Sequence, residues 1–86
     1  MATAYVLIKI SAGIPHSVHG MVNMFKDLGE VEQADILFGD YDMVLKLKGD
    51  KIHDIENFVL EKVLSDENVD STTTMLCVNE NVIQQE

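Results

Sequence analysis

The sequence contains no arginine, no tryptophan, one proline and one cysteine, and each scarcity excludes something. A lone cysteine, Cys77, cannot form an internal disulfide, which fits a reducing compartment such as the cytoplasm. A chain without arginine lacks the planar side chain that holds a carboxylate or phosphate through two parallel hydrogen bonds. We therefore expect any anionic ligand to be held by lysine, by backbone amides or by helix N-termini.

Positive charge is scarce as well, because six basic residues face 15 acidic ones and the formal net charge is −9. Such a chain repels a phosphate backbone, so we expect no direct binding to nucleic acid. No apolar run approaches the ~20 residues that span a bilayer. The first four residues also lack the basic and apolar regions of a secretory signal. The sequence therefore predicts a cytoplasmic protein with no membrane partner.

Apolar residues make up 47% of the 86 residues, and their spacing predicts the element order βαββαβ. The predicted elements are a strand at 4–10, a helix at 15–28, a hairpin at 31–48, a helix at 51–64 and a strand at 69–78. Since each βαβ crossover is right-handed, this order predicts a ferredoxin-like α+β fold. We expect residues 1–86 to form one domain, a four-stranded antiparallel sheet with both helices on one face.

The hairpin at 31–48 reverses at Gly39-Asp40, where both residue types tolerate the positive φ of a tight turn. Tyr41 and Asp42 begin the second strand, so two carboxylates and a phenol crowd one turn with unpaired backbone amides. The carboxylates could accept hydrogen bonds from an amino group, while loop N–H groups hold a carboxylate. The alternative is an ordinary turn whose acidic side chains are solvated or cap the backbone.

Both faces of the predicted sheet carry apolar side chains. In the first strand, Val6 and Ile8 share one face, while Tyr5 and Leu7 share the other. If the helices cover one face, no remaining segment is large enough to cover the second. We therefore predict a homodimer, a dimeric α/β sandwich in which sheet packs on sheet. The alternatives are a C-terminal tail folded over the sheet, or a shallow mixed surface.

Other reactive residues give weaker signals. His16 and His19 stand three positions apart, but no third ligand lies near them in sequence, so we expect no metal site. Cys77 falls within the last strand with no histidine partner suggested, which indicates a core residue. The three threonines at 72–74 are also ordinary strand formers. No catalytic triad, phosphate loop or dinucleotide fingerprint is present, so we expect neither an enzyme nor a cofactor.

Three segments together resemble a known family, and they cover nearly the full chain. They are the hairpin with Phe38-Gly39-Asp40-Tyr41-Asp42-Met43-Val44-Leu45, the second helix with Phe58-Val59-Leu60-Glu61-Lys62, and Val69-Asp70-Ser71-Thr72-Thr73-Thr74. They look like the effector-binding domain of the Lrp/AsnC transcriptional regulators, also called the RAM domain. The resemblance implies a βαββαβ unit that dimerises through its sheets and assembles into octamers or similar rings. It also implies amino acid binding at interfaces between dimers.

By position, the resemblance assigns ligand contact to seven residues. They are Gly39, Asp40, Tyr41, Asp42, Thr72, Thr74 and Met75. Full-length regulators of the family also carry an N-terminal helix-turn-helix, whereas this sequence starts three residues before its first predicted strand. The resemblance then implies a stand-alone module that senses an amino acid in transcription regulation, or that modulates full-length Lrp/AsnC regulators by mixed assembly. The alternative is a ligand-independent interaction module that co-assembles with such regulators.

Overall fold

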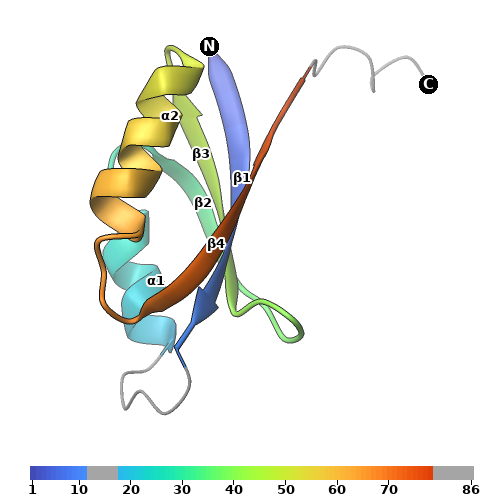
Figure 1. Ribbon diagram of the computed structural model, residues 1–86, viewed down its shortest axis with the longest axis vertical. Helices are drawn as coiled ribbons and strands as arrows, with labels where there is room; N and C mark the ends of the chain where they lie inside the picture. The colour runs from blue at the N-terminus through green and yellow to red at the C-terminus, as the bar shows by residue number, and fades with distance from the viewer. Residues whose placement is uncertain (12–17, 79–86) are drawn as a thin grey trace, which may run out of the picture.

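The computed structural model describes residues 1–11 and 18–78. The elements are β1 (Ala2–Ile10), α1 (Val18–Lys26), β2 (Val31–Ile36), β3 (Met43–Gly49), α2 (Ile52–Phe58), η1 (Val59–Val63) and β4 (Val69–Leu76). The strands form one antiparallel sheet in the order β2-β3-β1-β4, and both helices lie on one side of it (Figure 1). The predicted ferredoxin-like α+β fold is confirmed. No helix in these two ranges is long and apolar enough to cross a membrane.

One continuous core fills the space between the sheet and the helices. Its fully buried side chains include Ala4, Val6 and Ile8 from β1, Met43, Leu45 and Leu47 from β3, and Phe25, Ile55 and Val63 from the helical layer. The strand residues alternate because successive side chains point to opposite faces of a sheet. Fully burying one large apolar side chain contributes roughly 1.5–3 kcal/mol, so this face of β1 and β3 fixes the packing of both helices.

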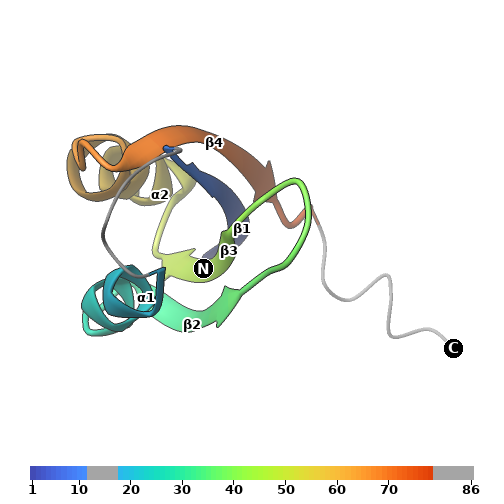
Figure 2. The ribbon, with the colours of Figure 1, turned by 90° about the horizontal axis from the view of Figure 1, so that it is seen from below.

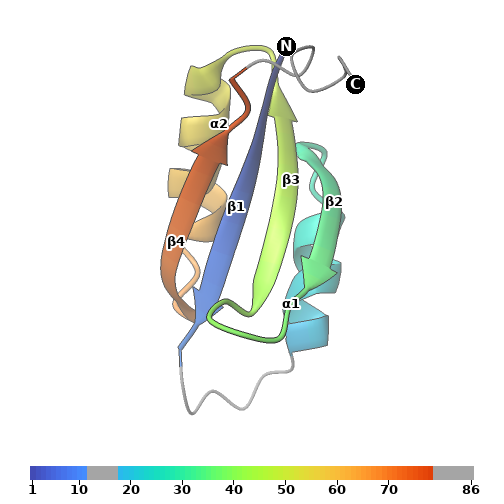
Figure 3. The same ribbon diagram turned by 90° about the vertical axis from the view of Figure 1, so that its right-hand side faces the viewer.

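β1 and β3 lie at the centre of the sheet, and β2 and β4 form its edges (Figure 3). β1 pairs with both β3 and β4, so Leu7 lies between Val44 on one side and Thr73 on the other. These three residues belong to the face opposite the helices, which we call the free face. The end of β1, the start of β4 and the β2–β3 connection meet at one end of the sheet (Figure 3).

The β2–β3 connection is longer than the tight turn that the sequence predicts. β2 ends at Ile36 and β3 begins at Met43, so six residues, 37–42, join the strands. Among the described residues only Gly39 has a positive φ, of 157°, and Asp40 does not share it. The predicted β-hairpin is confirmed, but its connection is longer than expected and Asp40 does not adopt the expected positive φ. The Leu37 N–H donates to the Asp42 carbonyl across the hairpin, and the Asp42 N–H donates to the Ile8 carbonyl, so the start of the longer connection is also held against β1.

Several element boundaries also differ from the prediction. The second predicted helix, 51–64, changes register at Val59, where the Leu64 N–H donates to the Val59 carbonyl at 2.8 Å. This i to i+5 bond makes η1 a π-helical turn, which a 3.6-residue period does not predict. The last strand ends at Leu76, two residues before the predicted end. For the first helix, the predicted start at 15–17 lies outside the described residues.

Candidate functional site

The β2–β3 connection packs against the ends of β1 and β4 and bends toward the free face, away from the helices (Figure 2). We call this place the hairpin corner: residues 37–42 with the adjoining residues of β1 and β4. Asp42 connects the hairpin corner to β1 through two hydrogen bonds. Its N–H donates to the Ile8 carbonyl at 2.9 Å, and its carboxylate Oδ2 accepts the Ile10 N–H at 2.7 Å. The Asp42 carboxylate thus caps the backbone, which is one of the two interpretations of this turn.

The backbone of β1 explains why a carboxylate is needed at this point. The register of β1 against β4 shifts between Lys9 and Ile10. A bulge of this kind interrupts the regular ladder, and a partly buried N–H without an acceptor is costly. The Asp42 side chain supplies that acceptor from 32 residues away in sequence.

Tyr41 connects the hairpin corner to the free face. Its hydroxyl lies 3.1 Å from Oγ1 of Thr73, and either oxygen can be the donor. Thr73 stands opposite Leu7 on the free face. A phenol and a hydroxyl therefore meet where the edge strand β4 passes the connection.

The hairpin corner also carries both signs of charge. Lys9, the last outward residue of β1, is exposed, and its Nζ donates to the backbone carbonyl of Asp40 at 3.2 Å. The Asp40 residue is itself exposed. An ammonium and a carboxylate at one corner can bind the opposite charges of a zwitterion through charge-assisted hydrogen bonds.

Four of the seven residues assigned by the resemblance lie together in the connection: Gly39, Asp40, Tyr41 and Asp42. Met75 lies apart from them on the free face, opposite Tyr5 of β1. The other two, Thr72 and Thr74, point to the opposite side of β4, toward α2.

Sequence reasoning missed two residues at this corner, Lys9 and Thr73. The alternation of the strand already separated Thr73 from its two threonine neighbours. Only the pairing of β4 with β1 shows that Thr73 is the threonine facing the hairpin corner.

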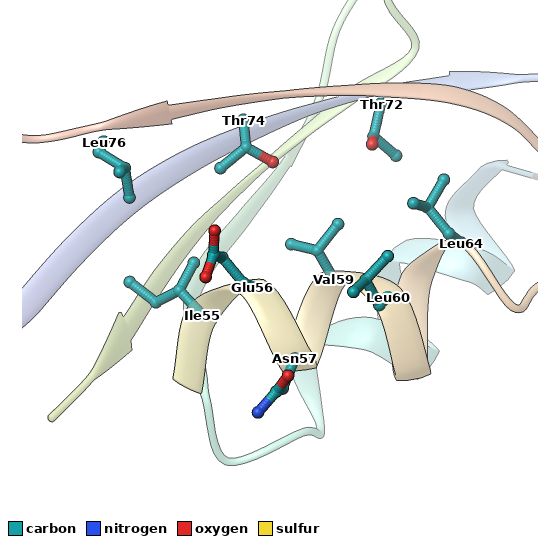
Figure 4. Close-up of a pocket in the computed structure, with 9 residues that line it drawn as sticks. All are labelled: Ile55, Glu56, Asn57, Val59, Leu60, Leu64, Thr72, Thr74 and Leu76. Carbon is teal, nitrogen blue, oxygen red and sulfur yellow. The ribbon is translucent and has the colours of Figure 1, made fainter. Parts of the chain in front are cut away.

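A second concave region lies between β4 and the helical layer of α2 and η1. This groove has a volume of about 540 Å³. Its apolar walls come from Ile55, Val59, Leu60 and Leu64, and β4 adds Thr72, Thr74 and Leu76 (Figure 4). The groove and the hairpin corner thus lie on opposite sides of β4.

The free face has an apolar centre and a charged margin. Leu7 and Val44 are half-buried beside Tyr5, whose exposed fraction is 40%. Lys46 of β3 lies 3.5 Å from the Glu32 carboxylate and 6.0 Å from the centroid of the Tyr5 ring. The free face therefore combines apolar and charged side chains, whereas the alternation of residues along the strands predicted an apolar face.

The histidines and the cysteine were the remaining candidate residues. Within residues 1–11 and 18–78, no group of three or more His, Cys, Asp or Glu side chains could hold a metal ion. His19 is exposed, and His16 lies outside the described residues. Cys77 is half-buried just beyond β4 instead of within the core, and its N–H donates to the Thr3 carbonyl.

Residues 3–85 match the sequence profile of the family described as the Lrp/AsnC ligand binding domain. The chain belongs to this family. The resemblance drawn from the hairpin, the second helix and the last strand is therefore confirmed, and the Lrp/AsnC domain accounts for nearly all of the chain. The family consists of ligand-binding domains of regulators and not of enzymes, which agrees with the absence of a catalytic motif.

The Lrp/AsnC domain is 36% identical over 73 residues to the HTH-type transcriptional regulator FL11 of Pyrococcus furiosus. The alignment takes 85% of this chain and 46% of FL11, so the chain spans about half the length of that curated relative. The solved structure of PHS023 from Pyrococcus horikoshii is 26% identical, with a TM-score of 0.81, and each chain is covered in full.

A more distant structure shares the fold alone. It is a transcriptional regulator of Neisseria meningitidis, solved in complex with L-Met. It is 18% identical to this chain and has a TM-score of 0.74, and the match covers 92% of this chain and 51% of the regulator.

Proposed function

We propose that the chain is an effector-binding module that acts as an oligomer in amino-acid-responsive transcription regulation. The observation that carries the proposal is the match of residues 3–85 to a ligand-binding domain of regulators. The net charge of −9 argues against DNA contact by this chain itself. We expect it in the cytoplasm, where such regulators act.

The proposed effector is an amino acid bound at the hairpin corner. Its ammonium group would be held by the Asp40 carboxylate, which is exposed. Its carboxylate would be held by Lys9, whose Nζ is already 3.2 Å from the Asp40 carbonyl, and by amides of the connection. The L-Met complex of the Neisseria meningitidis regulator is consistent with this class of ligand at the level of the fold.

The proposed site keeps the seven residues assigned by the resemblance and adds Lys9 and Thr73. Thr72 and Thr74 face α2 within their own subunit. They can therefore contribute to the same ligand only across an interface between subunits. This requirement agrees with effector binding at contacts between dimers, as the resemblance implies.

The proposed assembly is a homodimer built through the free face, with dimers joining into an octamer or a similar ring. The apolar centre of the free face, around Leu7 and Val44, would pack on the same patch of a second copy, as a two-fold interface requires. The charged margin with Lys46 and Glu32 would form the rim.

The test of the effector proposal is calorimetric titration of the chain with each common amino acid. We expect at least one to bind, and Lys9→Gln to weaken its binding about tenfold, the loss of one charge-assisted hydrogen bond. Lys26→Gln removes a lysine at the end of α1, away from the corner, and should bind like the parent. Binding by no amino acid, or equal binding by Lys9→Gln, contradicts the proposal.

A second candidate function is a ligand-independent module that co-assembles with full-length Lrp/AsnC regulators. The observation that favours it is the 36% identity to FL11, a regulator of about twice the aligned length. The free face of this chain would pack on the corresponding sheet face of such a regulator in a mixed dimer. Light scattering after mixing the chain with FL11 tests the idea, and the absence of mixed species counts against it.

A further inference from the structure

The proposed effector site is divided between two surfaces that a single copy cannot bring together. Residues 39–42 lie at the hairpin corner, whereas Thr72 and Thr74 face the groove between β4 and the helical layer. If both sets hold one effector, the corner of one copy meets the groove of the next. The groove then surrounds the part of the effector that the corner leaves free.

The part left free is the effector's side chain. The corner offers the Asp40 carboxylate for the α-ammonium group and the Lys9 Nζ for the α-carboxylate. These two contacts hold every amino acid alike. Selectivity for one effector therefore depends on what surrounds the side chain.

The groove offers that side chain a wall of leucine. The π-helical turn η1 keeps Val59 and Val63 in the core and leaves Leu60 and Leu64 61% and 44% exposed. The groove volume of about 540 Å³ lies within the roughly 300–1,000 Å³ of small-ligand sites. These walls gain most from an effector that brings apolar area of its own.

One acidic residue reaches into the same space. The Glu56 carboxylate points from α2 toward β4, and no lysine belongs to the described residues that line the groove (Figure 4). An acidic side chain would therefore meet a like charge with nothing to balance it. A basic side chain would gain little, because Glu56 is 63% exposed and already lies 3.6 Å from the Nδ1 of His53.

Phe38 supplies a further apolar group from the side of the hairpin corner. Its side chain is fully exposed, so nothing in the described part of its own subunit covers the ring. The connection that carries it projects from the sheet on the free side (Figure 2). It is held in place because the Leu37 N–H donates to the Asp42 carbonyl and the Asp42 N–H to the Ile8 carbonyl, each at 2.9 Å. An aromatic ring on such a fixed backbone loses little conformational entropy when a second molecule covers it.

We infer, on the basis of the proposed effector site, that the effector is an amino acid with a large apolar side chain, held between two subunits. Phe38 of one copy lies against this side chain. Leu60 and Leu64 of the neighbouring copy lie against it from the other side. Phe38 is then a specificity-determining residue that acts together with the groove of the next copy, and effector binding strengthens the contact between the two copies.

The first test compares effectors that differ only in the side chain, by calorimetric titration of the parent chain. Leucine should bind at least about tenfold more tightly than alanine, because it buries additional hydrocarbon groups. Lysine and glutamate should bind at least about tenfold more weakly than leucine. If no amino acid binds, the effector proposal itself fails. If amino acids bind with equal affinity whatever their side chain, only the assignment of the apolar class fails.

Variants test the role of Phe38. Phe38→Ala should weaken leucine binding about tenfold and leave alanine binding within about twofold, because only the longer side chain reaches the ring. Phe38→Leu keeps an apolar group and should retain most of the leucine affinity. Met24→Ala removes an exposed apolar side chain of α1 that belongs to neither surface, and it should bind leucine like the parent.

Mixed assemblies test whether the site spans two copies. Leu60→Ala should weaken leucine binding as Phe38→Ala does, because each variant removes one wall of the site. When the two variants are co-expressed, some sites combine the intact Phe38 of one variant with the intact Leu60 of the other. These sites should regain the parent affinity for leucine, which neither variant shows alone.

Three outcomes overturn the inference. The first is lysine or glutamate binding as tightly as leucine. The second is an equal loss of leucine and alanine binding in Phe38→Ala, which means that the ring acts on assembly and not on selectivity. The third is the absence of recovery in assemblies that native mass spectrometry shows to contain both variants, which means that each site lies within one copy.

Discussion

Asp42 shows how a single side chain positions the candidate site. One of its carboxylate oxygens satisfies the Ile10 N–H at the bulge in β1, and its own N–H bonds to Ile8. The residue therefore holds the connection against the sheet whether or not a ligand is bound. A loss of ligand binding in an Asp42 variant would reflect displacement of the corner as well as loss of charge.

Replacing Asp42 separates these contributions in the free energy of unfolding. Asp42→Ala leaves the Ile10 N–H without an acceptor and should cost about 1–3 kcal/mol. Asp42→Asn retains an amide oxygen that can accept the same hydrogen bond, so it should cost less than half as much. Urea unfolding at one fixed protein concentration measures both. Equal losses in the two variants would mean that charge, and not the backbone cap, is what matters.

Two glycines should respond to alanine with opposite signs, although an added Cβ meets no atom within 4 Å at either position. Gly39 has a φ of 157°, which an L-residue rarely adopts, so Gly39→Ala should lower the free energy of unfolding by roughly 1 kcal/mol. Gly20 lies inside α1, where Gly20→Ala should raise it by about 0.5–1 kcal/mol. Thermal unfolding of both variants measures the two changes. If both variants are stabilised, or both are destabilised, the prediction is wrong.

At the scale of elements, the helices show where periodicity is sufficient and where it fails. The apolar spacing correctly identifies a second helix ending near residue 64, yet gives no sign that its last turn is π-helical. A π-helical turn holds more residues than an α-helical turn, but apolar residues four positions apart lie on nearly the same side of the helix in both. The buried Val59 and Val63 satisfy both patterns, so the sequence cannot distinguish them.

Helix α1 is anchored in the core by Met21, Val22 and Phe25, of which Phe25 is the largest. Phe25 is fully buried, whereas its neighbour Met24 is 49% exposed. Phe25→Ala should lower the free energy of unfolding by about 3–5 kcal/mol, because it removes a large core side chain and leaves a cavity. Met24→Ala serves as the matched control and should change it by no more than about 0.5 kcal/mol. Chemical unfolding tests the pair, and similar losses would mean that Phe25 does not anchor α1.

At the scale of the whole molecule, no helix or strand within residues 1–11 and 18–78 covers the free face, because both helices lie on the other side of the sheet. The core uses the other face of the sheet, and the hairpin corner opens beside Thr73 on the free side. Assembly and effector binding are therefore proposed for adjoining surfaces. A ligand that binds one association state better than another will shift the equilibrium toward it.

The proposed dimer predicts a selective effect of a charge on the free face. Leu7→Asp places a carboxylate at the centre of the proposed interface and should yield a folded monomer at micromolar concentration. Met24→Asp introduces the same group on exposed α1, on the other side of the sheet, and should leave the dimer intact. Sedimentation velocity distinguishes them. If the parent chain itself sediments as a monomer, the proposed interface is wrong.

The net charge of −9 on each copy predicts how association responds to salt. Like charges oppose assembly, and their repulsion is screened over about 10 Å at 0.1 M ionic strength. Raising sodium chloride from about 0.02 M to about 0.5 M should therefore tighten the dimer. Sedimentation equilibrium at both salt concentrations measures the effect. Weaker association in high salt would mean that ion pairs across the rim dominate instead.

The sequence by itself determined the order of the elements, the two faces of the central strands and the family, because these depend on short-range spacing and on local motifs. It also placed Gly39 to Asp42 at a chain reversal. The tertiary structure alone decided that Lys9 lies beside Asp40, that Asp42 caps Ile10, and that Thr73 faces the hairpin corner. Each of these contacts joins residues more than 30 positions apart. They follow from the register of paired strands, and a shift of one residue would turn every side chain to the other face.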